Sequence, residues 1–134
     1  MSNKLKVVDL GAGISQVRRK TATWLLPANA PRTIDDLNFT SRDETGSLNR
    51  WDVTPTKTDY WSVHQQHGRA LAFEFLDLLH NPDGEDIHEH TFGLIASEIV
   101  SQPMPMADKM RTDGIYIGFF ELISEYLING RVDR

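Results

Sequence analysis

The chain has 134 residues, a formal net charge of −5 at pH 7 and no cysteine. Its length fits one domain with a hydrophobic core, so we treat residues 1–134 as a single globular domain. The lack of cysteine excludes disulfides, thiolate metal sites and cysteine nucleophiles, and the 40% hydrophobic content argues against disorder.

Charge is unevenly distributed along the chain. Residues 1–20 carry five basic side chains and one acidic one, whereas residues 61–134 carry five basic and twelve acidic ones. The acidic body argues against extended contact with nucleic acid, which relies on many lysines and arginines. The start of the chain lacks an apolar secretory segment, and no apolar run reaches the roughly 20 residues that cross a bilayer. We expect a soluble, cytoplasmic protein with no membrane contact.

Residues 1–60 are rich in β-branched and turn-forming residues and predict a β-rich part. Thr21–Leu26 suits either a strand or a helix, and Thr33–Leu37 predicts a short capped helical turn. The strand candidates are Lys4–Leu10, Leu48–Val53 and Thr56–Tyr60.

A glycine motif lies near the start of the chain. Val7–Gly13 resembles the first motif of Rossmann-like methyltransferases, in which a strand runs into a glycine turn beside adenosylmethionine. That fold needs several strand–helix units, but Pro27 and Pro31 interrupt the next unit and the later half is helical. We therefore interpret Gly11 and Gly13 as a tight turn, where glycine permits positive φ.

The first predicted helix is Trp61–His80. Its apolar residues recur at the spacing of a core-facing stripe, and Asn81–Pro82 ends it. Thr58 or Asp59 is a candidate N-cap. Gly68 lies on the apolar stripe, where it predicts close packing of another backbone.

The second predicted helix is Ile87–Ser101, with Asp86 as N-cap and Glu89 completing a capping box. The prolines that follow predict an extended connector through Met106.

The third predicted helix is Asp113–Asn129, with Gly130 as its left-handed cap residue. Its apolar face is unusually wide, which is typical of a central helix or of one packed in an oligomer interface. The candidate interface residues are Ile117, Phe120, Leu127 and Ile128. Together these elements predict an α+β fold, with the β-rich residues 1–60 packed against about three helices in residues 61–134.

All five histidines fall within one stretch that is also rich in carboxylates. Imidazoles and carboxylates are ligands for zinc, iron and manganese. If the second helix began after His88, the rings of His88 and His90 could converge. The candidate metal ligands are His64, His67, His80, His88, His90, Glu85 and Glu89. The alternative is a solvated turn between two helices that holds no metal, and we expect no cofactor.

Three tryptophans, Trp24, Trp51 and Trp61, are candidates for lining a small-molecule pocket. The chain lacks the Gly-x-Ser-x-Gly, Walker A and His-Glu-x-x-His motifs of common enzymes. The first hypothesis is therefore a non-enzymatic interaction or regulatory protein that acts through protein contacts and forms a homodimer. The alternatives are a small metal-dependent enzyme or metal-binding protein, and a small-molecule binding domain.

Overall fold

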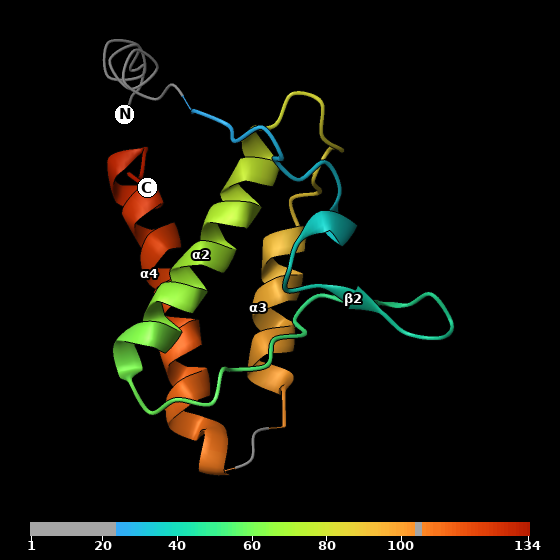
Figure 1. Ribbon diagram of the computed structural model, residues 1–134. Coiled ribbons are helices and arrows are strands. Elements are labelled where there is room, and N and C mark those ends of the chain that lie inside the picture. The colour runs from blue at the N-terminus through green and yellow to red at the C-terminus, as the bar shows by residue number, and fades with distance from the viewer. Residues whose placement is uncertain (1–23, 104–105) are drawn as a thin grey trace, which may run out of the picture. The chain divides into compact units, whose positions relative to one another are not determined.

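The computed structural model describes residues 24–103 and 106–134. This part is mostly helical, with one small antiparallel sheet (Figure 1). Its elements are the 3-10 helix η1 (Ile34–Asp36), the strands β2 (Ser41–Arg42) and β3 (Leu48–Asn49), the helices α2 (Trp61–His80) and α3 (Thr91–Ser101), the 3-10 helix η2 (Met106–Asp108) and the helix α4 (Lys109–Asn129).

The chain divides into two compact units, residues 26–124 and residues 1–25 with 125–134. The larger unit holds the sheet, α2, α3 and most of α4. In the described part of the smaller unit, the Trp24 and Tyr126 rings meet edge to face at 5.9 Å, and the Arg134 guanidinium lies 6.0 Å from the Trp24 ring centre. No helix in the described ranges is both long enough and apolar enough to span a bilayer.

The sheet is a hairpin of two strands, each two residues long. Ser41 pairs with Asn49, and Arg42 pairs with Leu48. Its turn is built on Asp43, whose carboxylate accepts the backbone N–H groups of Thr45 at 2.9 Å and Ser47 at 3.0 Å. These hydrogen bonds, with that of the Thr45 hydroxyl foremost, lower the pKa of Asp43. Gly46 completes the turn at a φ of 85°, a conformation that glycine adopts without strain.

Carboxylates on the helices hold the hairpin segment in place. Glu74 of α2 accepts the backbone N–H of Asn38 at 2.8 Å. Glu98 of α3 accepts the backbone N–H of Arg50 at 2.7 Å and the Arg50 guanidinium at 2.9 Å. Because these bonds tie backbone groups to helix side chains, a segment with little regular structure keeps a fixed path.

The three helices of the larger unit alternate in direction along the chain. Helix α3 runs opposite to α2 and to α4, as expected for helices joined by short connections (Figure 1). Helices α2 and α4 therefore run parallel, so residues later in α2 contact residues later in α4. Trp61 lies against Gly114, and Gln65 lies against Gly118.

Glycines bring α2 and α4 unusually close together. A Cβ added at Gly68 would collide with the carbonyl oxygen of Ile115 and lie 2.7 Å from the amide nitrogen of Phe119. A Cβ at Gly118 would collide with the carbonyl oxygen of Gln65 and lie 2.8 Å from its carbonyl carbon. The obstructing atoms are backbone atoms, so the two helices touch main chain to main chain. This confirms the close approach that Gly68 predicted.

An aromatic cluster fills the space between the hairpin segment and α4. The Phe39 ring centre lies 5.4 Å from that of Trp51 and 5.6 Å from that of Phe119, and Trp51 and Phe119 lie 5.1 Å apart. All three side chains are buried. Their edge-to-face and tilted arrangements are the preferred geometries of aromatic pairs.

The predicted helices agree with the structure best at their C-terminal ends. Helix α2 has the predicted bounds, α3 and α4 end where expected, and Gly130 has a φ of 73°. The turn at Thr33–Leu37 is also confirmed as η1, with Thr33 in the capping position.

Several predicted boundaries are wrong. Helix α3 begins at Thr91, because residues 87–90 form a turn, and its N-cap is His90 rather than Asp86. Helix α4 begins at Lys109, earlier than predicted, and η2 replaces the end of the extended connector. The N-cap of α2 is Tyr60, although the Thr58 hydroxyl accepts the Tyr60 N–H at 3.3 Å.

The β-rich part is smaller than predicted in the described residues. Only Leu48–Asn49 of the Leu48–Val53 candidate is a strand, and Thr56–Tyr60 is a loop. Its partner β2 was not predicted. Residues 24–26 of the Thr21–Leu26 candidate are irregular, and Lys4–Leu10 and the Val7–Gly13 motif lie outside the described residues.

We predict that Gly68→Ala lowers the free energy of unfolding by about 2 kcal/mol or more, because the added methyl group must push two backbones apart. The better helix propensity of alanine offsets only about 1 kcal/mol of this loss. Urea unfolding of both proteins measures the difference.

The matched control is Gly93→Ala in α3, where an added Cβ meets no heavy atom within 4 Å. Its stability should be unchanged or slightly higher. Equal stability of Gly68→Ala and the parent would contradict the close helix contact.

Candidate functional site

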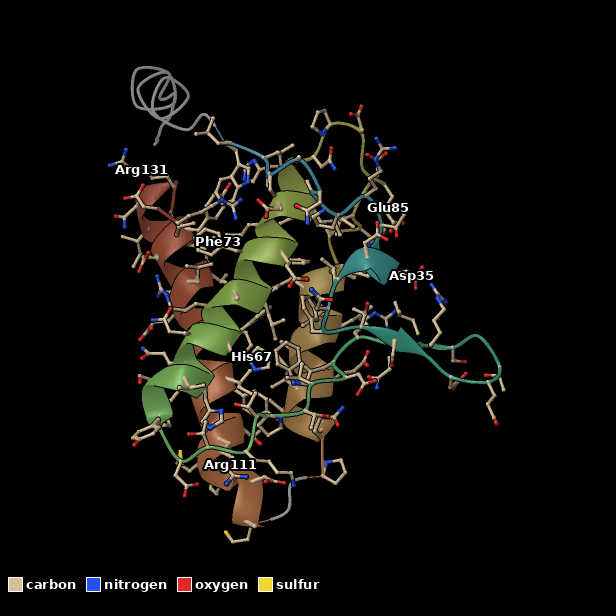
Figure 2. All side chains as sticks on the ribbon, in the orientation of Figure 1. Asp35, His67, Phe73, Glu85, Arg111 and Arg131 are labelled. Atoms are coloured by element: carbon tan, nitrogen blue, oxygen red, sulfur yellow. The ribbon has the colours of Figure 1, made fainter. Side chains whose placement is uncertain are left out.

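The loop before α2 is fastened to both α2 and α4 through one carbonyl group. The Thr58 carbonyl oxygen accepts from His64 Nε2 at 2.7 Å and from Arg111 Nε at 3.0 Å. Arg111 also donates to the Asp59 carboxylate at 3.0 Å. Arg111 therefore positions the end of this loop from α4 (Figure 2).

The side chains of His64 and His67 point from α2 into the fold. His64 is fully buried, and its bond to a carbonyl requires that Nε2 carries the proton. Nδ1 of His64 and Nδ1 of His67 are buried without a hydrogen-bond partner in the described structure. Burial lowers the pKa of His67, and the nearby His64 lowers it further. Both side chains pack within the fold, and the lowered pKa of His67 means that its protonation destabilises the folded state.

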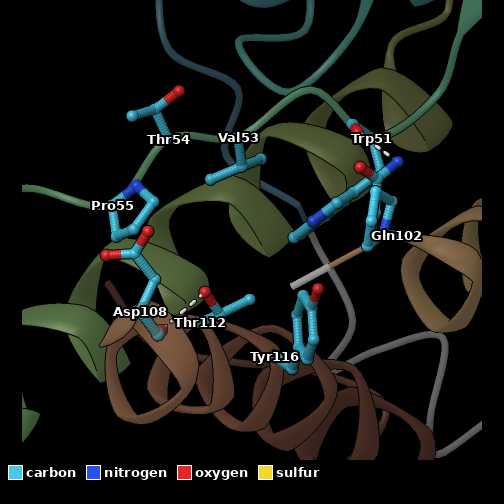
Figure 3. Close-up of a pocket in the computed structure, with 9 residues that line it drawn as sticks. Trp51, Val53, Thr54, Pro55, Gln102, Asp108, Thr112 and Tyr116 are labelled. Atoms are coloured by element: carbon cyan, nitrogen blue, oxygen red, sulfur yellow. Dashed lines mark hydrogen bonds between the residues drawn. The ribbon is translucent and has the colours of Figure 1, made fainter. Parts of the chain in front are cut away.

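A pocket of about 200 Å³ opens between the loop after β3, the end of α3 and the first half of α4 (Figure 3). Its aromatic wall is formed by Trp51 and Tyr116, whose ring centres lie 6.0 Å apart with planes at 58°. The lining residues are Trp51, Val53, Thr54, Pro55, Gln102, Pro103, Asp108, Thr112 and Tyr116.

The polar groups of this pocket come from η2, α4 and the end of α3. Gln102 donates its side-chain N–H to the Trp51 carbonyl at 3.2 Å, and the Thr112 hydroxyl donates to the Asp108 carbonyl at 2.8 Å. The lining carries one carboxylate, that of Asp108, and no lysine or arginine among the described residues. Burial, followed by the charge of Asp113, raises the pKa of Tyr116, so the phenol stays neutral near pH 7.

An apolar patch lies on the other side of α4. Met110, Gly114 and Ile117 share one helix face, and Trp61 of α2 packs on Gly114 with its ring carbon 3.5 Å from the position of an added Cβ. Trp61, Met110 and Ile117 remain 39%, 37% and 46% exposed. We call these three side chains the Trp61 patch.

Charged and polar pairs border the Trp61 patch. Glu121, one turn beyond Ile117, accepts from Gln65 at 2.8 Å and pairs with Arg69 at 3.4 Å. Lys109 pairs with Asp113 at 2.7 Å at the other end. An apolar centre with a polar rim of both charges is the usual anatomy of a protein interface.

The predicted metal ligands do not gather into a site in the described part of the chain. No group of three histidine, aspartate or glutamate side chains in residues 24–103 and 106–134 is placed to hold a metal ion. His64 and His67 point from α2 into the fold, and His80 lies at the end of that helix. Glu89 is exposed in the loop that precedes α3.

His88 and His90 do converge, because α3 begins after both of them. Their ring centres lie 4.6 Å apart, and His88 Nδ1 accepts the backbone N–H of His90 at 3.1 Å. Their predicted partner Glu85 serves another purpose: its carboxylate accepts the backbone N–H of Ile34.

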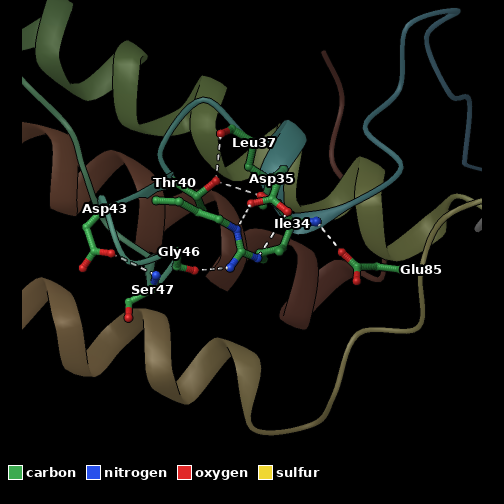
Figure 4. A network of polar contacts seen from close by, with 9 residues as sticks. Ile34, Asp35, Leu37, Thr40, Asp43, Gly46, Ser47 and Glu85 are labelled. Carbon is green, nitrogen blue, oxygen red and sulfur yellow. Dashed lines mark hydrogen bonds and ion pairs between the residues drawn. The ribbon is translucent and has the colours of Figure 1, made fainter.

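Glu85 belongs to a network that ties the loop before α3 to η1 and the hairpin (Figure 4). The backbone N–H of Glu85 donates to the Arg32 carbonyl at 2.8 Å. On the hairpin side, Arg42 pairs with Asp35 at 2.7 Å and donates to the Gly46 carbonyl at 2.8 Å. These acidic groups thus have partners within the fold.

The tryptophans and the predicted interface residues are dispersed. Trp51 lines the pocket, whereas Trp61 belongs to the patch and Trp24 to the smaller unit. Phe120 is half-buried, with its ring 6.0 Å from that of Phe92. Ile117 is partly exposed, and the two remaining interface candidates, Leu127 and Ile128, are 75% and 78% exposed.

Sequence analysis missed most of the pocket and one of the three residues of the Trp61 patch. Gln102, Asp108, Thr112 and Tyr116 come from segments whose relative placement no sequence motif indicates. Met110 was missed because the start of α4 was placed too late. The helix spacing of Met110 and Ile117 was available as a signal.

Searches of protein-family models, of curated proteins and of solved structures gave no match to this chain.

We predict that the free energy of unfolding decreases as the pH falls below about 6.5. The folded-state pKa of His67 lies below its ordinary value of 6.5, so the unfolded chain binds the proton first. The stability is complete above pH 6.5 and is lost as the pH falls towards the folded-state pKa. His80, whose pKa burial also lowers, contributes in the same direction.

Urea unfolding at several pH values between about 5 and 7.5 measures this slope. His67→Gln should flatten it and leave the contribution of His80. An identical slope in His67→Gln and the parent protein would exclude His67 as its source.

Proposed function

We propose that the protein is a self-associating interaction module whose Trp61 patch binds the same patch of a second copy. The observation that carries the proposal is the exposure of Trp61, which packs on Gly114 of α4, together with that of Ile117 on the same face of α4. Tryptophan is enriched in the residues that dominate binding energy, especially when polar groups surround it.

The rim supports a second copy of this chain as the occupant. It carries cations at Arg69 and Lys109 and anions at Asp113 and Glu121. A two-fold axis through an interface brings each patch against an identical patch. With both signs on one rim, cations of one copy can face anions of the other, which a rim of a single sign would not allow.

The rigidity of the patch also supports this role. Trp61 sits on the α2–α4 contact, where backbones touch at Gly68 and Gly118. Side chains on such a support lose little further freedom on binding, which lowers the entropic cost of association. We propose a binding role rather than catalysis.

The test is the mass of the protein in solution as a function of concentration, measured by sedimentation equilibrium. We expect a monomer–dimer equilibrium in the parent protein. Ile117→Glu should weaken dimerisation by about tenfold or more, because it places an unpaired charge in the apolar centre.

The matched control is Leu94→Glu, which introduces the same charge at a leucine of α3 that is 43% exposed, close to the 46% of Ile117. Its dimerisation should equal that of the parent protein. A parent protein that is monomeric at every concentration, or equal effects of the two substitutions, would overturn the proposal.

A further inference from the structure

The pocket at Trp51 and Tyr116 offers several acceptor atoms to a ligand. The amide of Gln102 uses one of its two N–H bonds on the Trp51 carbonyl, which leaves the other N–H and the side-chain oxygen. The hydroxyl of Thr112 uses its proton on the Asp108 carbonyl, which leaves the oxygen lone pairs. A carboxylate only accepts, so Asp108 adds two further acceptor atoms. The pocket can therefore accept several hydrogen bonds from a ligand.

The negative charge of Asp108 is only weakly balanced by the protein. Arg111 lies 3.5 Å from Asp108 Oδ1, but it is 3.0 Å from both the Asp59 carboxylate and the Thr58 carbonyl oxygen. Asp108 Oδ2 has no hydrogen-bond partner among the described residues. The pocket therefore favours a ligand with positive charge.

The aromatic wall has the same preference. The faces of tyrosine and tryptophan rings attract cations, and the phenol of Tyr116 is neutral near pH 7. The volume of about 200 Å³ is smaller than a pocket for a drug-sized molecule, which starts near 300 Å³. It suits one side-chain-sized group.

We propose that this pocket binds an alkyl cation of the guanidinium or ammonium type. The charged head lies against Asp108, near the Thr112 hydroxyl, and the alkyl stem passes along Tyr116 and Trp51 (Figure 3). Charge complementarity, the unused acceptors and the size of the pocket each favour this class over an anion or a neutral lipid.

The site is separate from the Trp61 patch. Thr112 and Tyr116 lie one turn apart on one side of α4, and Asp108 ends η2 four residues before Thr112, whereas Met110 and Ile117 lie on another side of α4. A cation in the pocket could come from a free small molecule or from an arginine or lysine side chain of a peptide. The two sources share the same chemistry and are distinguished by the test.

The test is an NMR titration of the full chain with butylguanidinium chloride at constant ionic strength. The reporter is the indole N–H resonance of Trp51, identified with Trp24→Phe and Trp61→Phe because neither residue lines the pocket. We expect a saturable shift of this resonance. Butylurea, which has a similar shape and no charge, should bind more weakly by about tenfold or more.

Two variants test the assigned residue. Asp108→Asn should weaken butylguanidinium binding by about tenfold or more, because it removes the charge and keeps the shape. Glu89→Gln removes one charge before the other end of α3 and should leave binding unchanged. The spectrum of each variant also shows whether the fold is kept.

A short peptide with one arginine, compared with its citrulline counterpart, identifies the source of the cation. Tighter binding of the arginine peptide than of butylguanidinium indicates a partner side chain, and the reverse indicates a free cation. The proposal is overturned if neither cation shifts the Trp51 resonance, if butylurea binds equally, or if Asp108→Asn binds like the parent protein.

Discussion

The contact between α2 and α4 is the constraint on which the rest of the larger unit depends. Gly68 and Gly118 remove the side chains that would keep the two helices apart, and backbone meets backbone. Because Phe119 lies at this contact, its ring enters the aromatic cluster with Phe39 and Trp51. The hairpin segment, which has only four strand residues, thus packs on a surface that the helices form.

The same contact gives α4 two different surfaces. Trp61 rests on Gly114, so the side of α4 that carries Met110 and Ile117 continues an apolar surface from α2. Another side of the helix carries Thr112 and Tyr116 and, with Asp108 of η2, lines the pocket. One rigid helix thereby presents an apolar surface and an acidic, aromatic one, each supported from behind by buried side chains.

Periodic patterns predicted the α-helices well, whereas the predicted N-caps of α2 and α3 were wrong. Helix α2 follows from its apolar spacing and from Asn81–Pro82, and both are features of one segment. Asp86 and Glu89 resemble a capping box, yet that stretch instead bonds to η1 through Glu85, a contact between segments 51 positions apart. Such distant competition explains why α3 begins later than its sequence pattern indicates.

Residues of the candidate sites could be predicted from the sequence only where the residue type alone drew attention to them. Trp51 and Ile117 stood out from the sequence as an aromatic and as an excess apolar residue. Gln102 and Thr112 carry no such mark, because their role follows from the hydrogen bonds that they make at the pocket.

The parallel contact of α2 and α4 also bears on folding kinetics. It joins groups such as Gln65 and Glu121, 56 positions apart, so the intervening α3 must double back before the glycines can meet. Loop closure of this length is slow, and the length of the connections around α3 should therefore set the folding rate more than the stability.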